Sequence, residues 1–328
     1  MNVLIGVDVG ATTIAGGLVT SDGEVLCAET TPTHNGPGTL LERVFAVIAR
    51  AMAQAARRHV AVEGIGLGLA GVVDVDRGTM ISELNHWTRE LANVPLAREI
   101  RGVTGVPTFV DNDANALALG EWRFGVGRGL SSMVLLAIGT NIGGGIILNG
   151  DVVRGASGYA GELAHMSLKP DGPPCVCGAR GCLNGFIGGL AIAEEGRRRA
   201  ERDGQSRMLA LAGGDPAAIT AATVFAAATG GDPTAAALVD EACGALAATL
   251  ASIVNGLNPE LIVVTGGVAT SLVALEKIVT QRVARLTFAQ PFAVTRFSIV
   301  PGDKKLTVRG GAALAVSELE RRSERSRR

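Results

Sequence analysis

One histidine and three cysteines lie close together in a part of the sequence rich in proline and glycine. His165 is followed by Cys175, Cys177 and Cys182. A Cys₃His set satisfies tetrahedral Zn²⁺ with no open position, so the spacing predicts a structural zinc site. The alternative is a group of buried thiols beside a core histidine, without a metal. If zinc holds His165 through one ring nitrogen, the other nitrogen is fixed in direction and can bond a substrate hydroxyl.

Carboxylates and amides alternate where a predicted strand gives way to a predicted helix over residues 113–124. The run reads Asp111, Asn112, Asp113 and, one residue later, Asn115. Either Asp111 or Asn112 is well suited to cap the helix. A heavily capped helix start would explain one or two of these residues but not the full set. A carboxylate there can accept the proton of an attacking hydroxyl, so we interpret Asp113 as a general base and Asn112 as a residue that orients the substrate.

Three glycine turns follow predicted apolar strands. They contain Asp8, Gly10, Thr12 and Thr13 in the first, Gly139, Thr140 and Asn141 in the second, and Gly266 and Gly267 in the third. Such turns let backbone N–H groups approach phosphate oxygens, and the first also offers a carboxylate for Mg²⁺. The first turn matches neither a Walker A nor a GxGxxG pattern. An Asp-Gly turn alone is a common structural feature, but three turns at three strand ends favour a nucleotide site.

The elements around these residues follow an α/β pattern. An antiparallel meander over 3–9, 14–19 and 24–28 precedes a helix over 40–59, and further strands are expected at 65–69 and 107–110. Strands at 133–138 and 145–148 repeat the opening arrangement, which suggests a duplicated domain plan. The remaining expected elements are alanine-rich helices over 191–257, a strand at 261–264, and a last amphipathic helix at 310–320.

Composition bounds the class of protein. The chain has 328 residues, of which 47% are hydrophobic, and a formal net charge of −1, so it is long enough for two domains and is not disordered. The near-zero charge gives no electrostatic case for nucleic acid or for a membrane as partner, and we interpret the basic residues 321–328 as a solvated helix end. No secretory signal opens the sequence, and uninterrupted apolar runs are far shorter than the roughly 20 residues of a membrane span. We expect a cytoplasmic protein.

The motifs together resemble the ROK family (repressors, open reading frames and kinases), and within it the zinc-containing sugar kinases such as glucokinase. The similarity runs over essentially the whole chain. The segments that carry it are DVGATTIAGGLV, GLAGVVD, DNDANALALGE, AIGTNIGGGI, GELAHM, CVCGARGC and VVTGGV.

This resemblance implies an α/β, actin-like (ribonuclease H-like) sugar kinase fold with two domains and an active site in the cleft between them. We expect a small domain over 1–118, with a C-terminal helix at 310–328 packed back on it, and a large domain over 119–309 that carries the zinc motif. The implied activity is ATP-dependent phosphorylation of a hexose hydroxyl, with ATP, Mg²⁺ and structural Zn²⁺ as cofactors. A homodimer is usual in the family.

The resemblance also assigns roles by position. Asp113 matches the catalytic base. The implied sugar-binding residues are Gly71, Asn112, Asp113, Glu162, His165 and Asn184. The implied nucleotide- and phosphate-binding residues are Asp8, Gly10, Thr12, Thr13, Gly139, Thr140, Asn141, Gly266 and Gly267. The implied zinc ligands are His165, Cys175, Cys177 and Cys182.

One departure from the family pattern concerns the sugar. The usual run GCLE reads Gly181-Cys182-Leu183-Asn184 here, so a carboxylate has become an amide, which also donates hydrogen bonds. Another hexose, an N-acylated aminosugar or a cyclitol is therefore an alternative to glucose as substrate. A milder departure is Ala164, where glycine is usual.

Two other classes of function compete with a kinase. A sugar-responsive repressor of this family carries a winged-helix segment before the first strand, and here that strand begins at Val3. A sugar-binding protein without catalysis is the other alternative, and the presence of both Asp8 and Asp113 argues against it.

Overall fold

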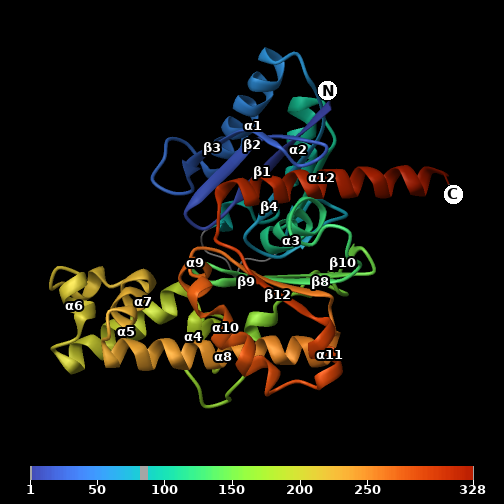
Figure 1. The fold of residues 1–328 in the computed structure, drawn as a ribbon. Coiled ribbons are helices and arrows are strands. Elements are labelled where there is room, and N and C mark those ends of the chain that lie inside the picture. Colours follow the sequence, from blue (N-terminus) through green and yellow to red (C-terminus); the bar gives the residue numbers. More distant parts are fainter. Residues whose placement is uncertain (1, 82–87, 328) are drawn as a thin grey trace. The chain divides into compact units, whose positions relative to one another are not determined.

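A meander of three antiparallel strands opens the chain and forms three strands of a five-stranded sheet (Figure 1). The computed structural model describes residues 2–81 and 88–327. The strand order is β3-β2-β1-β4-β7, and β4 and β7 run parallel to β1. The bounds are β1 Asn2–Val9, β2 Thr13–Thr20, β3 Val25–Pro32, β4 Ala61–Leu69 and β7 Thr108–Asn112.

Helices pack against this first sheet. Helix α1 contacts β1 and β2, α2 contacts β7, and α12 contacts β1, β4 and α3. Thr39 and Glu42 form a capping box that fixes the start of α1, which supports the sequence prediction of a helix from residue 40. The bounds are α1 Leu40–Arg57, α2 Leu96–Thr104, α3 Asp113–Phe124 and α12 Lys304–Arg327.

Glycines let α12 lie directly on the strands. A Cβ added to Gly6 on β1 would stand 1.8 Å from the Val308 carbonyl oxygen, and one on Gly66 of β4 would stand 2.0 Å from that of Gly311. No side chain fits at such distances, so the helix backbone touches the sheet. Helix α12 is longer than the predicted 310–320. Gly310 and Gly311 lie inside the helix, where they allow this close contact, and do not mark its start.

The second sheet repeats the plan of the first, as the sequence suggested. Its order is β10-β9-β8-β11-β12, with β9 and β10 antiparallel and β11 and β12 parallel. The bounds are β8 Met133–Ile138, β9 Ile142–Leu148, β10 Asp151–Val152, β11 Leu261–Thr265 and β12 Arg296–Ile299. A separate two-stranded hairpin consists of β5 Val73–Asp74 and β6 Thr79–Met80.

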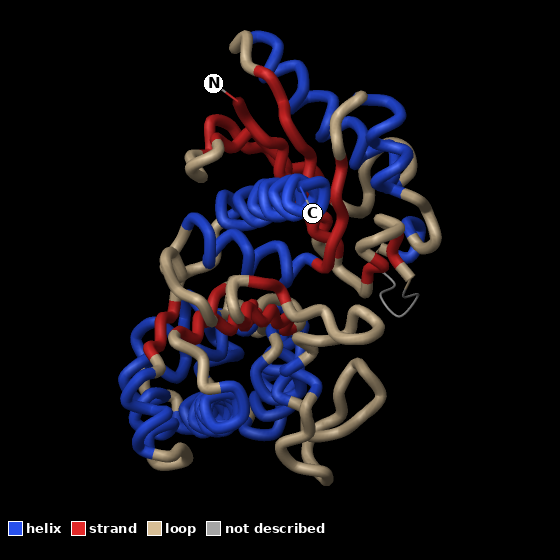
Figure 2. Tube along the Cα trace, turned by 90° about the vertical axis from the view of Figure 1, so that its right-hand side faces the viewer, coloured by secondary structure: helices blue, strands red, loops and turns tan. Residues whose placement is uncertain are grey.

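Helix α8 (Pro233–Leu257) is the central helix beside the second sheet and contacts α4, α5, α7 and α10. Asp232 caps its first turn and accepts from the N–H of Ala235. The other helices are α4 Leu183–Ile187, α5 Gly189–Asp203, α6 Arg207–Leu211, α7 Ala221–Thr229, α9 Ala269–Leu272, α10 Glu276–Ala284 and α11 Ala289–Val294. Figure 2 shows helices and strands throughout the described chain.

Helix α8 is also the one helix among the described residues that is long and apolar enough to cross a membrane, with a mean hydropathy of 1.6. Its sequence contains no long uninterrupted apolar run, because Thr, Ser and Gly stand between its apolar residues. In the structure 61% of the relevant window is buried, as expected for a core helix. Length and composition alone are weak evidence for a span.

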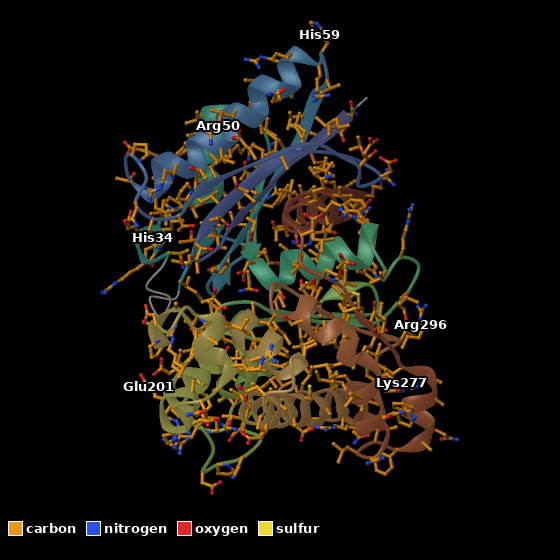
Figure 3. All side chains as sticks on the ribbon, turned by 60° about the vertical axis from the view of Figure 1, so that its left-hand side comes forward. His34, Arg50, His59, Glu201, Lys277 and Arg296 are labelled. Carbon is orange, nitrogen blue, oxygen red and sulfur yellow. The ribbon has the colours of Figure 1, made fainter. Side chains whose placement is uncertain are left out.

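The chain divides into two units that differ in extent from the expected domains. One consists of residues 1–133, 145–161 and 303–328, and the other of 134–144 and 162–302. The expected boundary at residue 118 falls inside α3, which packs on α12 and belongs to the first unit in full. Charged side chains such as Arg50 on α1 and Glu201 on α5 extend from the exposed faces of their own helices (Figure 3).

Candidate active site

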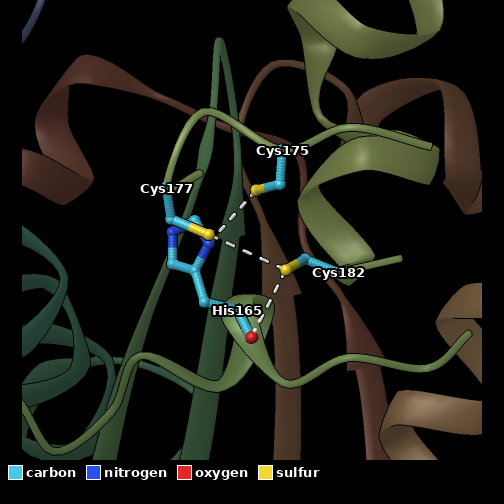
Figure 4. Close-up of side chains that lie close together, drawn as sticks. All are labelled: His165, Cys175, Cys177 and Cys182. Atoms are coloured by element: carbon cyan, nitrogen blue, oxygen red, sulfur yellow. Dashed lines mark hydrogen bonds between the residues drawn. The ribbon is translucent and has the colours of Figure 1, made fainter. Parts of the chain in front are cut away.

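The predicted zinc ligands come together in the second unit. One possible ligand atom from each of His165, Cys175, Cys177 and Cys182 lies within 4.8 Å of all the others. The Cys177 and Cys182 sulfurs are 3.8 Å apart, and the Cys175 sulfur lies 3.4 Å from His165 Nδ1 (Figure 4). Tetrahedral zinc with bonds of about 2.3 Å to sulfur and about 2.0 Å to nitrogen places two sulfurs about 3.8 Å apart and sulfur and nitrogen about 3.5 Å apart. The donor set therefore fits a closed zinc site.

Tight turns position these cysteines. Cys175 N–H donates to the Ala179 carbonyl over 2.9 Å, and Gly178 closes the turn with φ +89°. Gly181 also has a positive φ of +71°, and a Cβ there would lie 1.7 Å from the Lys169 carbonyl oxygen. The glycines around the cysteines are thus required by the path of the chain.

Glu162 lies beside the ring nitrogen of His165 that does not face Cys175. The Nε2 atom is 3.8 Å from Glu162 Oε2. Burial lowers the pKa of His165 and raises the pKa of Glu162. A lowered pKa keeps the imidazole neutral, which is the form that binds a metal. The two side chains thus offer adjacent polar atoms of the kind that a sugar hydroxyl bonds.

Asn112 and Asp113 occupy the junction of β7 and α3 in the first unit. Asn112 is the N-cap, and its Oδ1 accepts from the N–H groups of Ala114 (2.9 Å) and Asn115 (3.1 Å). Its Nδ2 donates to the Gly71 carbonyl over 3.1 Å. Asp113 begins the helix and is half-buried. Three of the predicted sugar-binding residues, Gly71, Asn112 and Asp113, therefore lie together.

A buried ion-pair network that sequence reasoning missed supports this junction. The Asp111 side chain is nearly inaccessible and is bonded by Arg154 Nε at 2.8 Å and by Asn115 Nδ2 at 3.1 Å. Arg154 also pairs with Glu318 of α12 at 3.0 Å. The three charges come from distant parts of the sequence, which is why no local pattern reveals them. Arg154 thereby compensates the negative charge of Asp111, which would destabilise the fold if it were buried without a partner.

The first glycine turn connects β1 and β2. Gly10 N–H donates to the Thr13 carbonyl over 3.1 Å, and Thr33 bonds the turn twice, through its Oγ1 to the Gly10 carbonyl and through its N–H to the Thr12 carbonyl. Asp8 stands near the end of β1, paired with Gly68 of β4. Because β1, β4 and β7 are parallel, Asp8 and the Asn112 junction lie at the same edge of the sheet.

The second glycine turn connects β8 and β9. Gly139 N–H donates to the Asn141 carbonyl over 2.9 Å, while the carbonyls of Gly139 and Thr140 accept from the first N–H groups of α5. Asn184, on α4, accepts from Ile142 N–H over 2.8 Å. Its side chain is thus next to the turn and beside the cysteine cluster.

The third glycine turn follows β11. Gly266 has φ +102°, and a Cβ there would lie 2.5 Å from the Ile138 carbonyl oxygen. The N–H of Val268, two residues later, donates to the carbonyl of Ile138 over 3.0 Å. Gly267 has open space around it. The second and third turns therefore lie together at the ends of β8 and β11.

The predicted site residues thus form two groups, one in each unit. The first unit contains Asp8, Gly10, Thr12, Thr13, Gly71, Asn112 and Asp113. The second unit contains Gly139, Thr140, Asn141, Glu162, His165, Cys175, Cys177, Cys182, Asn184, Gly266 and Gly267.

Comparison with known proteins agrees with these motifs. Residues 4–318 match the ROK family. The chain belongs to this family. A glucokinase from Halalkalibacterium halodurans is 36% identical over 282 residues, which are 84% of each protein.

Two solved structures of ROK proteins are similar to this chain. A ROK hexokinase from Thermus thermophilus has a TM-score of 0.79 at 31% identity and covers 97% of this chain and 99% of its own. A ROK glucokinase from Streptomyces griseus, determined with glucose and AMPPNP, has a TM-score of 0.77 at 30% identity and covers 96% and 99%. The chain therefore has the actin-like two-domain fold of the ROK sugar kinases, as the sequence predicted.

Proposed function

We propose that this protein transfers the terminal phosphoryl group of ATP to a hydroxyl of a hexose, with glucose as the first candidate and Asp113 as the general base. The observation that carries the proposal is similarity over nearly the whole chain to ROK enzymes that phosphorylate glucose or hexose, at 30–36% identity. The half-buried position of Asp113 at the start of α3 supports its role, because Asn112 and the paired Asp111 hold that junction in place.

Phosphoryl transfer asks little covalent chemistry of a protein. Positioning, neutralisation of charge and a base for the attacking hydroxyl are sufficient. In the proposed reaction Asp113 takes the proton of the acceptor hydroxyl as the bond to phosphorus forms. Asn112, Gly71, Glu162 and His165 bind the other hydroxyls and orient the sugar.

The first two glycine turns bind the phosphoryl donor, ATP. Thr12 and Thr140 offer N–H groups for which no hydrogen bond is found among residues 2–81 and 88–327, while their carbonyls are occupied. Backbone donors without a protein partner suit phosphate oxygens. Asp8 would hold Mg²⁺, directly or through water, and Gly266 and Gly267 would pass close to the nucleoside.

Zinc would be held by His165, Cys175, Cys177 and Cys182, and it would fix the loop and the direction of the imidazole. With Nδ1 toward the cysteines, Nε2 is the nitrogen offered to a sugar hydroxyl, beside Glu162. We further propose that the enzyme is cytoplasmic and that it assembles as a homodimer. The homodimer rests on the family alone, and sedimentation of the purified protein tests it.

The test is ADP release with ATP and Mg²⁺ over a panel of glucose, mannose, fructose, allose, glucosamine, N-acetylglucosamine, N-acetylmannosamine and cyclitols. We expect one preferred sugar, and a loss of about 10²- to 10⁴-fold in kcat for Asp113→Asn. Asp240→Asn, which removes an exposed carboxylate on α8 that pairs with Arg282, is the matched control and should retain activity. Binding of sugar without ADP release would instead support a non-catalytic sugar-binding protein.

A further inference from the structure

The side chain of Asn184 is buried and makes its polar contacts within the second unit. It is 2% exposed. Its Oδ1 accepts from Ile142 N–H over 2.8 Å, and its Nδ2 donates to Asn141 Oδ1 over 3.3 Å. The orientation of the amide follows from these partners, because Ile142 N–H requires an acceptor. Both polar atoms of Asn184 are therefore bonded to the turn that joins β8 and β9.

The same short segment of chain holds the rest of that turn. The N–H of Gly189 bonds the Gly139 carbonyl over 2.8 Å, and the N–H of Leu190 bonds the Thr140 carbonyl over 3.1 Å. Together with the hydrogen bonds of Asn184, these two bonds hold residues 139–142 in place. The N–H groups of Thr140 and Asn141 have no hydrogen-bond partner among the residues that the structure describes.

Space around Asn184 is limited. A Cβ added to Gly188 would lie 2.6 Å from the Asn184 carbonyl oxygen and 2.9 Å from its Oδ1. A sugar hydroxyl could reach the amide only if this side chain left its buried position, because 2% of the residue is exposed. A glutamate, one methylene longer, would have to displace the turn or leave the buried position.

We propose that Asn184 is a positioning residue for the phosphoryl donor, which acts by holding the β8–β9 turn with its N–H groups toward the phosphates, and that it does not select the sugar. This proposal rests on the proposed kinase function. It differs from the selectivity hypothesis that the motif GCLN suggests, because it assigns the effect of the amide to ATP.

The test compares Asn184→Ala with Asn184→Asp. The alanine leaves Ile142 N–H buried without its acceptor, so we expect KM for ATP to rise about tenfold, with KM for the preferred hexose changed less than about twofold. The aspartate keeps the acceptor and can receive a hydrogen bond from a rotated Asn141 amide, so it should restore most of the ATP affinity. Calorimetric binding of AMPPNP gives the same comparison without turnover.

Asn255→Ala is the matched control. Asn255 also bridges two segments of the second unit, through Nδ2 to the Leu286 carbonyl and through Oδ1 from Phe288 N–H, each at 3.1 Å. It should reduce thermal stability without changing either KM. Zinc content, measured for every variant, shows whether the cysteine cluster is intact, and the aspartate variant remains informative if the alanine variant folds poorly.

Several outcomes would overturn the proposal. A raised KM for hexose or a changed order of preferred sugars in Asn184→Ala, with AMPPNP affinity preserved, would place the side chain at the sugar. An equal loss toward both substrates that the aspartate does not restore would make its role merely structural. Failure of the wild type to turn over any sugar would contradict the proposed function instead, and AMPPNP binding by the variants would still decide whether Asn184 supports the turn.

Discussion

The two glycine turns that begin the two sheets share a backbone plan and differ in what surrounds them. In each, a glycine N–H closes the turn on a carbonyl, from Gly10 to Thr13 and from Gly139 to Asn141. In each, the carbonyls of the glycine and of a tip residue are bonded to a neighbouring segment. The repeated plan therefore extends from the order of strands to individual hydrogen bonds.

The differences are in charge and support. Asp8 stands two residues before Gly10 of the first turn, whereas Ala137 occupies the corresponding position before Gly139 of the second. The buried Thr33 bonds the first turn, while the second is bonded by Asn184, which lies beside the cysteine cluster, and by the start of α5. Under the proposed function, we expect the first turn to hold a cation and the second turn to form an uncharged cradle for phosphate, with zinc supporting the second.

The largest expected effect comes from the metal. Cys182→Ser, or removal of zinc by a chelator, should destabilise the second unit on the order of 5 kcal/mol, because metal binding contributes directly to folding. Hydrogen exchange should rise in residues 139–148 and not in residues 8–20. Cys243→Ser, which alters a buried thiol of α8 outside the cluster, is the control. Equal exchange in both turns would show that their supports do not differ.

The next effect is on the cation. Asp8→Asn keeps the shape and removes the charge, so kcat/KM should fall on the order of 100-fold and saturation should require more Mg²⁺. Ala137→Ser, at the corresponding position of the second turn, should change little. Initial rates over a series of Mg²⁺ concentrations measure both. An unchanged Mg²⁺ dependence in Asp8→Asn would remove the distinction between the turns.

A smaller effect concerns Thr33, which bonds the first turn. Thr33→Val deletes the hydroxyl that donates to the Gly10 carbonyl and should cost about 1–3 kcal/mol. Thr295→Val deletes an equivalent buried hydroxyl, bonded to the Pro259 carbonyl in the second unit. Both should lower Tm, but only Thr33→Val should raise KM for ATP. If Thr295→Val raises it equally, the effect is one of global stability.

The smallest effect is on α8, which packs on the helix that carries Asn184. Burial disfavours the charged Asp232, but bonds from Ser206 and from backbone N–H groups outweigh it and hold its pKa below the ordinary value. A lowered pKa stabilises the fold above the unfolded value of about 3.9, and this contribution of about 1 kcal/mol is lost as the pH falls through the folded pKa.

Acidification from about pH 5 to about pH 2 should therefore lower the amide protection factors, which correct for the intrinsic exchange rate, more at the start of α8 than in α1. The exchange in Asp232→Asn should already be raised at neutral pH and should change less with acid. If acid affected wild type and variant alike, another carboxylate would be responsible.

Local patterns predicted the parts of the site that neighbouring residues determine. The start of α3 at Asp113, its cap by Asn112 and the gathering of His165 with three cysteines all follow from short-range spacing. The contacts of Asn184 with the turn and of Arg154 with Asp111 join residues about 40 positions apart, and no periodicity encodes them. The sequence also suggested that Gly310 begins the last helix, whereas it lies inside it, where only close packing explains a glycine.

The contact of α12 with β1 and β4 has a consequence for biosynthesis. The strands with Gly6 and Gly66 leave the ribosome early, but the helix that covers them is translated only after residues 134–302. One face of the first sheet therefore stays uncovered until α12 is translated, whereas the second unit can complete its packing before then. Chaperone dependence during translation should accordingly fall on the amino-terminal strands, and a nascent chain arrested before Lys304 should expose them to proteases.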